Sequence, residues 1–121
     1  MAAAATQQQI MRYWRSWQAP TDFEETRRCL ADDVAFDGGA MRVDGGDAVI
    51  AMMSANPVPW TDVQLVSEVY GDDAGAIVYE GTVSTSGVRM RVAELMTLRD
   101  GLITSVVATM TPKDANPFAE A

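Results

Sequence analysis

Residues 88–110, VRMRVAELMTLRDGLITSVVATM, decide the fold of this 121-residue chain. Two runs rich in β-branched and apolar residues flank Asp100-Gly101, a dipeptide favoured in the two-residue turns of β-hairpins. The pattern predicts strands over residues 88–98 and 102–110. Both strands are long, so this hairpin forms the centre of a sheet rather than a surface decoration.

The sequence before this hairpin continues the same pattern. Residues 63–70 and 76–83 alternate in the manner of strands, and residues 72–75 and 84–87 supply the turn-forming Asp, Gly, Ser and Thr between them. Short connections join neighbouring antiparallel strands. We therefore expect a four-stranded antiparallel meander over the second half of the chain.

The first half of the chain is helical in pattern. Thr6 with Gln9 forms a capping-box signature, and the apolar residues that follow at helical spacing predict a helix ending near Ala19-Pro20. Thr21 with Glu24 repeats the signature for a second, short helix. Further elements are expected in the order of two short strands at 33–37 and 41–43 and a third helix at about 48–54.

Composition limits the chemistry that this chain can perform. It has no His, a single Cys and a net charge of −8. Catalysis through His and ordinary Cys/His zinc sites are excluded, and nucleic acid is an unfavourable partner for such an acidic chain. No apolar run is long enough to span a membrane, so a cytoplasmic protein is expected. No metal or organic cofactor is expected either, because the chain has no His, one Cys, no glycine-rich phosphate loop and only scattered carboxylates. The length favours one domain over residues 1–121, with a core at about 7–111 and a loosely held tail at 112–121.

Glu94 is the most informative single residue. Strict alternation places it on the same face as Val92 and Met96, while Arg91 and Thr97 point the other way. A carboxyl buried among apolar groups has a raised pKa and can donate a hydrogen bond or act as an acid. The alternative is a β-bulge that reverses the alternation and lets Glu94 pair with an Arg on a neighbouring strand.

The whole chain resembles the NTF2-like superfamily, in its branch of SnoaL-like and ketosteroid-isomerase-like proteins. The resemblance covers about residues 7–111 and rests on four segments, which are Met11-Arg12-Tyr13, LADDVAFD at 30–37, DGGDAVI at 44–50 and ELMTL at 94–98 with DGLI at 100–103. It implies an α+β fold, in which a cone-shaped, curved antiparallel sheet wraps against three N-terminal helices. Proteins of this fold have many activities, so the fold alone does not give the function.

The resemblance also implies three catalytic residues. Tyr13 and Glu94 match the positions of the oxyanion-hole residues of ketosteroid isomerases, with Glu in place of a shorter Asp. Asp37 falls at, or one residue beside, the position of the general base. The structural alternatives are that Tyr13 belongs to the core and that Asp37 shapes the turn at Gly38-Gly39.

The expected function is that of a small-molecule isomerase, cyclase or lyase. It would act by proton transfer on an apolar, carbonyl-bearing substrate in a cone pocket, whose lining is expected to include Trp14, Trp17, Phe36, Met53, Met90 and Met96. The competing interpretation is a non-catalytic module that binds a hydrophobic ligand or dimerises. A homodimer through the sheet is also expected. By alternation, Ile103 and Val107 share one face of the last strand with Ser105 and Thr109, opposite Leu102, Val106, Ala108 and Met110, so both faces carry apolar groups and the outer one needs cover.

Overall fold

The computed structural model describes residues 2–114. Along the chain it contains α1 (Ala3–Ser16), α2 (Phe23–Cys29), β1 (Leu30–Asp37), β2 (Arg42–Asp44), α3 (Gly46–Ala55), β3 (Trp60–Tyr70), β4 (Ala74–Val83), β5 (Val88–Arg99) and β6 (Leu102–Pro112). This order confirms the expected fold of three helices and a curved sheet. None of the helices within the described residues is long and apolar enough to cross a membrane.

The six strands form one sheet in the order β2-β1-β6-β5-β4-β3. The meander of β3 to β6 is antiparallel, as expected, but β1 lies parallel to β6. The sheet is therefore mixed, which corrects the wholly antiparallel expectation. A parallel neighbour requires a long connection, and the segment from α3 to β5 supplies it.

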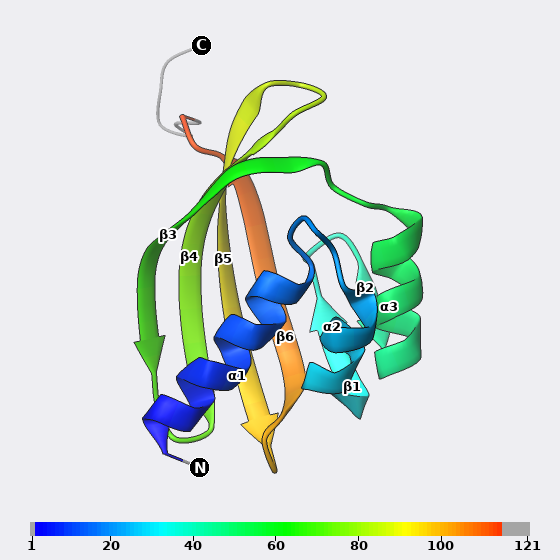
Figure 1. The fold of residues 1–121 in the computed structure, drawn as a ribbon, viewed down its shortest axis with the longest axis vertical. Coiled ribbons are helices and arrows are strands. Elements are labelled where there is room, and N and C mark those ends of the chain that lie inside the picture. The colour runs from blue at the N-terminus through cyan, green and yellow to red at the C-terminus, as the bar shows by residue number, and fades with distance from the viewer. Residues whose placement is uncertain (1, 115–121) are drawn as a thin grey trace.

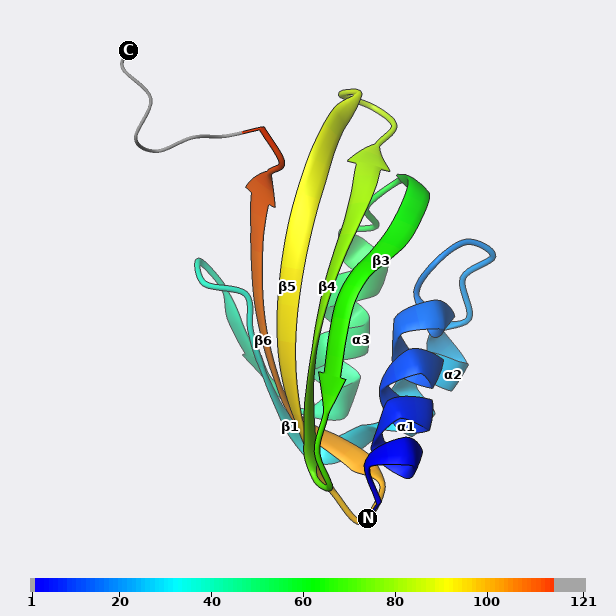
Figure 2. The same ribbon diagram turned by 90° about the vertical axis from the view of Figure 1, so that its left-hand side faces the viewer.

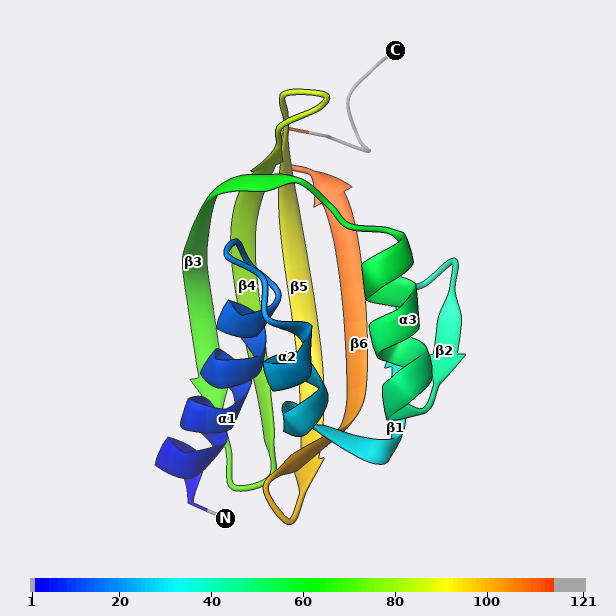
Figure 3. The ribbon, with the colours of Figure 1, turned by 45° about the vertical axis from the view of Figure 1, so that its right-hand side comes forward.

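All three helices cover one face of the sheet. Figure 2 shows the sheet curving around them, with α1 and α2 on one side of the concave face and α3 behind the strands. Figure 1 shows α1 crossing in front of β4 and β5, and Figure 3 shows α3 beside β6 and β1. The buried core lies between the two layers and includes Ile10 and Tyr13 of α1, and Ile77, Met96 and Ile103 of the sheet. Within residues 2–114, no helix covers the other face of the sheet.

Helix α1 begins earlier than the capping signature predicts. The helix starts at Ala3, so Thr6 lies inside it and does not cap it. The buried Thr6 hydroxyl donates a hydrogen bond to the Asp72 carbonyl at 2.7 Å and so fixes α1 to the turn between β3 and β4. In α2 the capping residue is Asp22 and not Thr21, because the Asp22 carboxylate accepts the Glu25 backbone N–H at 3.1 Å.

A register shift in the β5–β6 ladder changes which residues of β6 face inward. Thr97 pairs with Ser105 but Leu98 pairs with Ile103, so Thr104 is an extra residue in β6. Such a bulge reverses the alternation of side chains on its strand. Ile103 is consequently fully buried in the core while Val107 is exposed on the outer face. The expectation that these two residues share a face is wrong.

The last strand also extends further than expected. Thr111 and Pro112 pair with Arg91 and Met90 of β5, and the Lys113 backbone N–H donates to the Arg89 carbonyl at 2.9 Å. The predicted loose tail therefore does not begin at residue 112. The remainder of that predicted tail, residues 115–121, lies outside the described residues.

Candidate functional site

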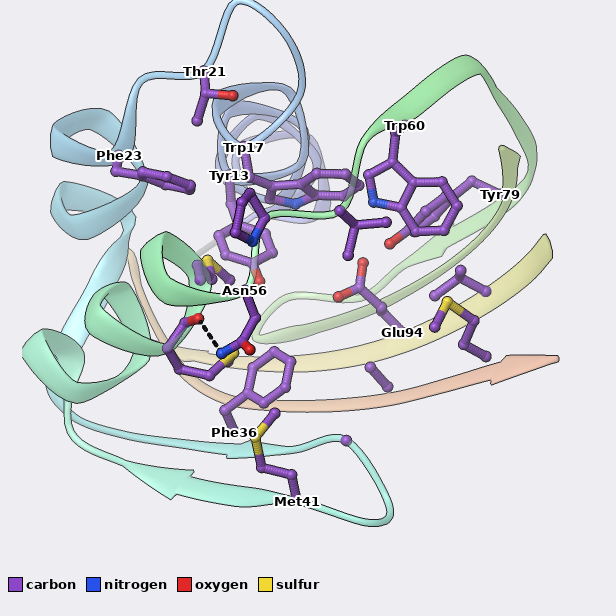
Figure 4. Close-up of a pocket in the computed structure, with 18 residues that line it drawn as sticks. Tyr13, Trp17, Thr21, Phe23, Phe36, Met41, Asn56, Trp60, Tyr79 and Glu94 are labelled. Atoms are coloured by element: carbon purple, nitrogen blue, oxygen red, sulfur yellow. Dashed lines mark hydrogen bonds between the residues drawn. The ribbon is translucent and has the colours of Figure 1, made fainter. Parts of the chain in front are cut away.

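A cavity of about 340 Å³ lies between the concave face of the sheet and the helices. Figure 4 shows its lining, which comes from both layers. Most of the lining is apolar or aromatic, and the polar side chains are few. The lining residues are Tyr13, Trp17, Thr21, Phe23, Phe36, Gly38, Met41, Met52, Met53, Asn56, Pro57, Val58, Trp60, Tyr79, Val92, Glu94, Ala108 and Met110.

Glu94 points into this cavity from β5. The burial pattern of β5 alternates as expected, so Val92, Glu94 and Met96 are all buried on the inner face. Burial raises the pKa of Glu94 to about 7, and the hydrogen-bonding influence of the Tyr79 hydroxyl opposes this rise. Its Oε2 atom is buried without a hydrogen-bond partner among the described residues. The geometry therefore supports the predicted placement on the apolar face and not the alternative of an ion pair with Arg.

Three cations, Arg89, Arg91 and Lys113, lie on the opposite face of the sheet around a different carboxylate, Glu80. Glu80 of β4 accepts Arg91 at 2.6 Å and Lys113 at 3.0 Å, and Arg89 approaches at 3.9 Å. Arg91 and Lys113 lower the pKa of Glu80, mainly through the hydrogen bond from Arg91. Two buried carboxylates on adjacent strands therefore have opposite environments. Glu80 is paired with cations, whereas Glu94 lies among apolar groups.

Tyr13 brings a second polar group into the cavity from α1. Its side chain is fully buried, and its hydroxyl has no hydrogen-bond partner among the described residues. Burial raises the pKa of the Tyr13 phenol, and the negative charge of a nearby ionised Glu94 raises it further. Tyr13 therefore stays neutral and has a hydroxyl proton to donate inside the cavity. A buried hydroxyl without a partner is energetically unfavourable unless a ligand satisfies it.

Tyr79 of β4 is a functional candidate that the sequence analysis missed. Its ring packs against Trp14 and Trp17, with centroid distances of 5.6 Å to each. Figure 4 shows its hydroxyl directed toward the Glu94 carboxyl. Burial is the main cause of its strongly raised pKa, followed by the charge of Glu94. Alternation along residues 76–83 places Tyr79 on the same face as Ile77. This pattern in the sequence could have identified Tyr79 as a residue of the inner face.

Asp37 does not join this site. It pairs with Val107 of β6, which in turn pairs with Leu95 of β5, and both of these residues are exposed on the outer face. The neighbouring Phe36 pairs with the buried Val106 and lines the cavity. The Asp37 carboxylate instead accepts the Gly39 backbone N–H at 2.9 Å, as in a turn. The structure thus brings Tyr13 and Glu94 together and places Asp37 on the other side of the sheet.

The expected lining residues divide into two groups. Trp17, Phe36 and Met53 line the cavity. Trp14, Met90 and Met96 do not, because Trp14 packs behind Tyr79 and Met96 is fully buried in the core. The sequence analysis missed the segment after α3, where Asn56, Pro57 and Val58 line the cavity.

Comparison with solved structures shows the same fold in other proteins. A candidate ketosteroid isomerase from Kribbella flavida DSM 17836 superposes with a TM-score of 0.83 at 17% identity, over 98% of this chain and 90% of that chain. An NTF-2 like protein of unknown function from Burkholderia xenovorans LB400 gives 0.81 at 16% identity, over 95% and 89%. An LEH-like epoxide hydrolase of M. tuberculosis gives 0.76 at 16% identity, over 90% and 84%.

These identities are low, so the similarity shows the fold alone, and the neighbours differ in the functions ascribed to them. A search of curated proteins finds no match to this sequence. At the family level, however, residues 10–106 match the SnoaL-like domain. Because this match spans most of the chain, the protein belongs to the SnoaL-like domain family and has its NTF2-like fold.

Proposed function

We propose that this protein is a small-molecule enzyme of isomerase, cyclase or lyase type, which transfers a proton on an apolar, carbonyl-bearing substrate held in the cavity. The observation that carries the proposal is the free Oε2 atom of the buried Glu94, which lines the same cavity as the unpartnered hydroxyl of Tyr13. The apolar lining favours a substrate with few polar groups.

Glu94 has the properties of a general acid–base group. Its pKa of about 7 means that both the protonated and the ionised forms are populated near neutral pH. A group that is poised in this way can accept a proton from carbon and return it without a large cost in either direction. Among the described residues that line the cavity, Glu94 is the one carboxylic acid. It therefore takes the role of base that the sequence analysis assigned to Asp37.

The proposed proton transfer uses Tyr13 and Glu94. The Tyr13 hydroxyl donates a hydrogen bond to the substrate carbonyl oxygen. Ionised Glu94 removes a proton from the carbon next to that carbonyl, and the electron pair of the broken C–H bond moves to the oxygen as an enolate. Glu94 then returns the proton to a carbon of the substrate. A preoriented donor at the oxygen stabilises the negative charge that develops there.

The second candidate function is non-catalytic binding of a hydrophobic ligand. One observation favours it: the described lining of the cavity offers a single carboxyl and no cation, whereas many acid–base sites use a pair of carboxyl groups. Tyr13 and Glu94 would then only hydrogen-bond to a ligand oxygen. The two functions share the cavity and differ in proton transfer.

Proton exchange at carbon separates these functions without knowledge of the natural substrate. The probe is 2-tetralone, an apolar ketone, in deuterated buffer, with NMR following the loss of the protons next to its carbonyl. We expect the protein to accelerate this exchange and Glu94→Gln to reduce the acceleration by about 10² to 10⁴-fold, the usual contribution of a general base. Tyr13→Phe should also reduce it, because the oxygen loses its donor.

Binding is measured in parallel through tryptophan fluorescence, since Trp17 and Trp60 line the cavity. Gln64→Leu is the control variant, because Gln64 pairs with Glu80 on the outer side of the sheet. Saturable binding of 2-tetralone with exchange at the buffer rate would support the binding module and overturn the enzyme. If neither 2-tetralone nor a phenol with one hydroxyl group, such as 2-naphthol or 4-phenylphenol, binds at all, both functions are overturned.

A further inference from the structure

Asn56 presents a second polar group to the cavity, far along the chain from Tyr13 and Glu94. It follows the last residue of α3, and it lies at the exposed rim of the cavity. Glu94 comes from the sheet, whereas Asn56 comes from the end of a helix that covers the concave face of the sheet. Figure 4 shows both side chains pointing into the cavity from these different walls.

The orientation of the Asn56 carboxamide follows from its own hydrogen bond. Its Nδ2 atom donates to the Met52 carbonyl at 3.1 Å, and the same carbonyl also accepts the Asn56 backbone N–H at 3.1 Å at the end of α3. A carbonyl oxygen can only accept, so Nδ2 must be the atom on that side of the amide. Oδ1 is then on the other side, and in Figure 4 it lies toward the interior of the cavity. Asn56 therefore offers a hydrogen-bond acceptor at the rim.

The polar groups on the inner wall have the opposite character. The Tyr13 hydroxyl is a donor without a partner, and the free oxygen of Glu94 is a second donor when the carboxyl is protonated. Most of the other lining residues, such as Phe36 and Met53, have apolar or aromatic side chains. The cavity thus has donors deep inside, an acceptor at the rim and a mostly apolar lining.

We propose that the cavity selects ligands with two polar ends: an oxygen acceptor that accepts the Tyr13 hydroxyl beside Glu94, and a hydroxyl or N–H donor at the far end that Asn56 Oδ1 accepts. The substrate class is then an apolar ring compound bearing a carbonyl at one end and a hydroxyl or amine at the other. This inference rests on the proposed function, because it assumes that the ligand occupies the same cavity.

The test uses matched aromatic probes of two lengths, with binding followed by tryptophan fluorescence. The shorter set is 2-naphthol, 6-methoxy-2-naphthol and 2,6-dihydroxynaphthalene, and the longer set is 4-phenylphenol, 4-methoxy-4′-hydroxybiphenyl and 4,4′-dihydroxybiphenyl. Within each set the second oxygen is absent, present without a proton, or present as a donor. A symmetric diol gains a factor of about two in affinity from its two equivalent orientations alone, so only a larger preference counts.

We expect one of the two diols to bind about five- to tenfold more tightly than its methoxy analogue, as one additional neutral hydrogen bond would give. Asn56→Leu should reduce this preference to about the twofold orientational factor, with little change for 2-naphthol or 4-phenylphenol. Asn56→Asp keeps an acceptor but loses the bond to Met52, so it should retain the preference if that variant is folded. Gln64→Leu is again the control.

The outcomes separate this inference from the function on which it rests. If the single phenols bind and 2-tetralone exchange proceeds, but neither diol is preferred, the two-ended ligand is refuted and the enzyme stands. A diol preference that persists in a folded Asn56→Leu variant also refutes the role of Asn56. Thermal melts of each variant show whether the loss of the helix-end hydrogen bond has changed folding, and Asn56→Asp then provides the decisive comparison.

Discussion

Replacement of Glu94 by Gln should stabilise the protein at pH 8 while leaving its stability near pH 5 little changed. Burial raises the pKa of Glu94 from its ordinary value of 4.5 to about 7. Each tenfold change in proton affinity corresponds to about 1.4 kcal/mol. The rise therefore corresponds to a free energy of about 3 kcal/mol, which is the cost of burying the ionised form.

The sign of this effect depends on which state binds more protons. Below the unfolded pKa of about 4.5, Glu94 is protonated in both states, so its ionisation does not affect the free energy of unfolding. Between 4.5 and about 7 the folded chain keeps a proton that the unfolded chain loses, so folding stability falls as pH rises. Above about 7 both states are ionised and the loss of about 3 kcal/mol is complete. Gln does not titrate, so the Glu94→Gln variant lacks this loss of folding stability with rising pH.

Thermal melts between pH 5 and pH 8 measure the difference. For a domain of this size, 3 kcal/mol corresponds to about 10 °C in melting temperature. We expect Glu94→Gln to melt about 10 °C above the unmodified protein at pH 8, and the gap to narrow steadily toward pH 5. Urea unfolding at the two extremes gives the same comparison as free energies.

Glu80→Gln is the matched control on the opposite face of the sheet. Glu80 is paired with Arg91, Lys113 and Arg89, and the first two of these cations lower its pKa. Ionised Glu80 therefore stabilises the fold above its ordinary pKa, and this stabilisation is lost as pH falls through its lowered pKa. Glu80→Gln should lower the melting temperature at pH 8. If Glu94→Gln lowers the melting temperature at pH 8 in the same way, Glu94 is an ionised partner of a cation, and the acid–base site is refuted.

Three shorter predictions concern the sheet and the chemistry. The outer face of the sheet carries a row of exposed apolar residues, Val69, Leu95 and Val107. We therefore expect a homodimer through this face and a monomer for Leu95→Glu. A mass of one chain for the unmodified protein, measured by sedimentation at micromolar concentration, would contradict this prediction. Asp37→Asn should leave 2-tetralone exchange within about twofold, because its carboxylate lies on the outer side of the sheet; a loss comparable with that of Glu94→Gln would return Asp37 to the site. Dialysis against a chelator should leave the melting temperature unchanged, and a stoichiometric ion whose removal unfolds the protein would overturn this expectation.

Local patterns were sufficient to predict the elements and part of the site. The turn at Asp100-Gly101 and the alternation around it specify a hairpin through interactions within a few residues of each other. The same alternation placed Glu94 among apolar neighbours, because a side chain in an unbroken strand must follow its period of two. Tyr13 lies on the buried flank of a helix whose other aromatic residues already marked that side.

The remaining features depend on which strands pair and in which register. The extra residue Thr104 turns Ile103 inward, and the pairing of Asp37 with Val107 directs its carboxylate outward. A shift of one residue between partners reverses a side chain, and no local pattern contains that shift. The convergence of Tyr79 and Asn56 on the cavity likewise arises from segments that meet only when the sheet curves around the helices. The sequence by itself therefore determined the elements and the apolar side of the strands whose alternation is unbroken, whereas the tertiary structure decided the inner face of β6 and which polar groups share the cavity, because only long-range strand pairing sets the register and brings these groups together.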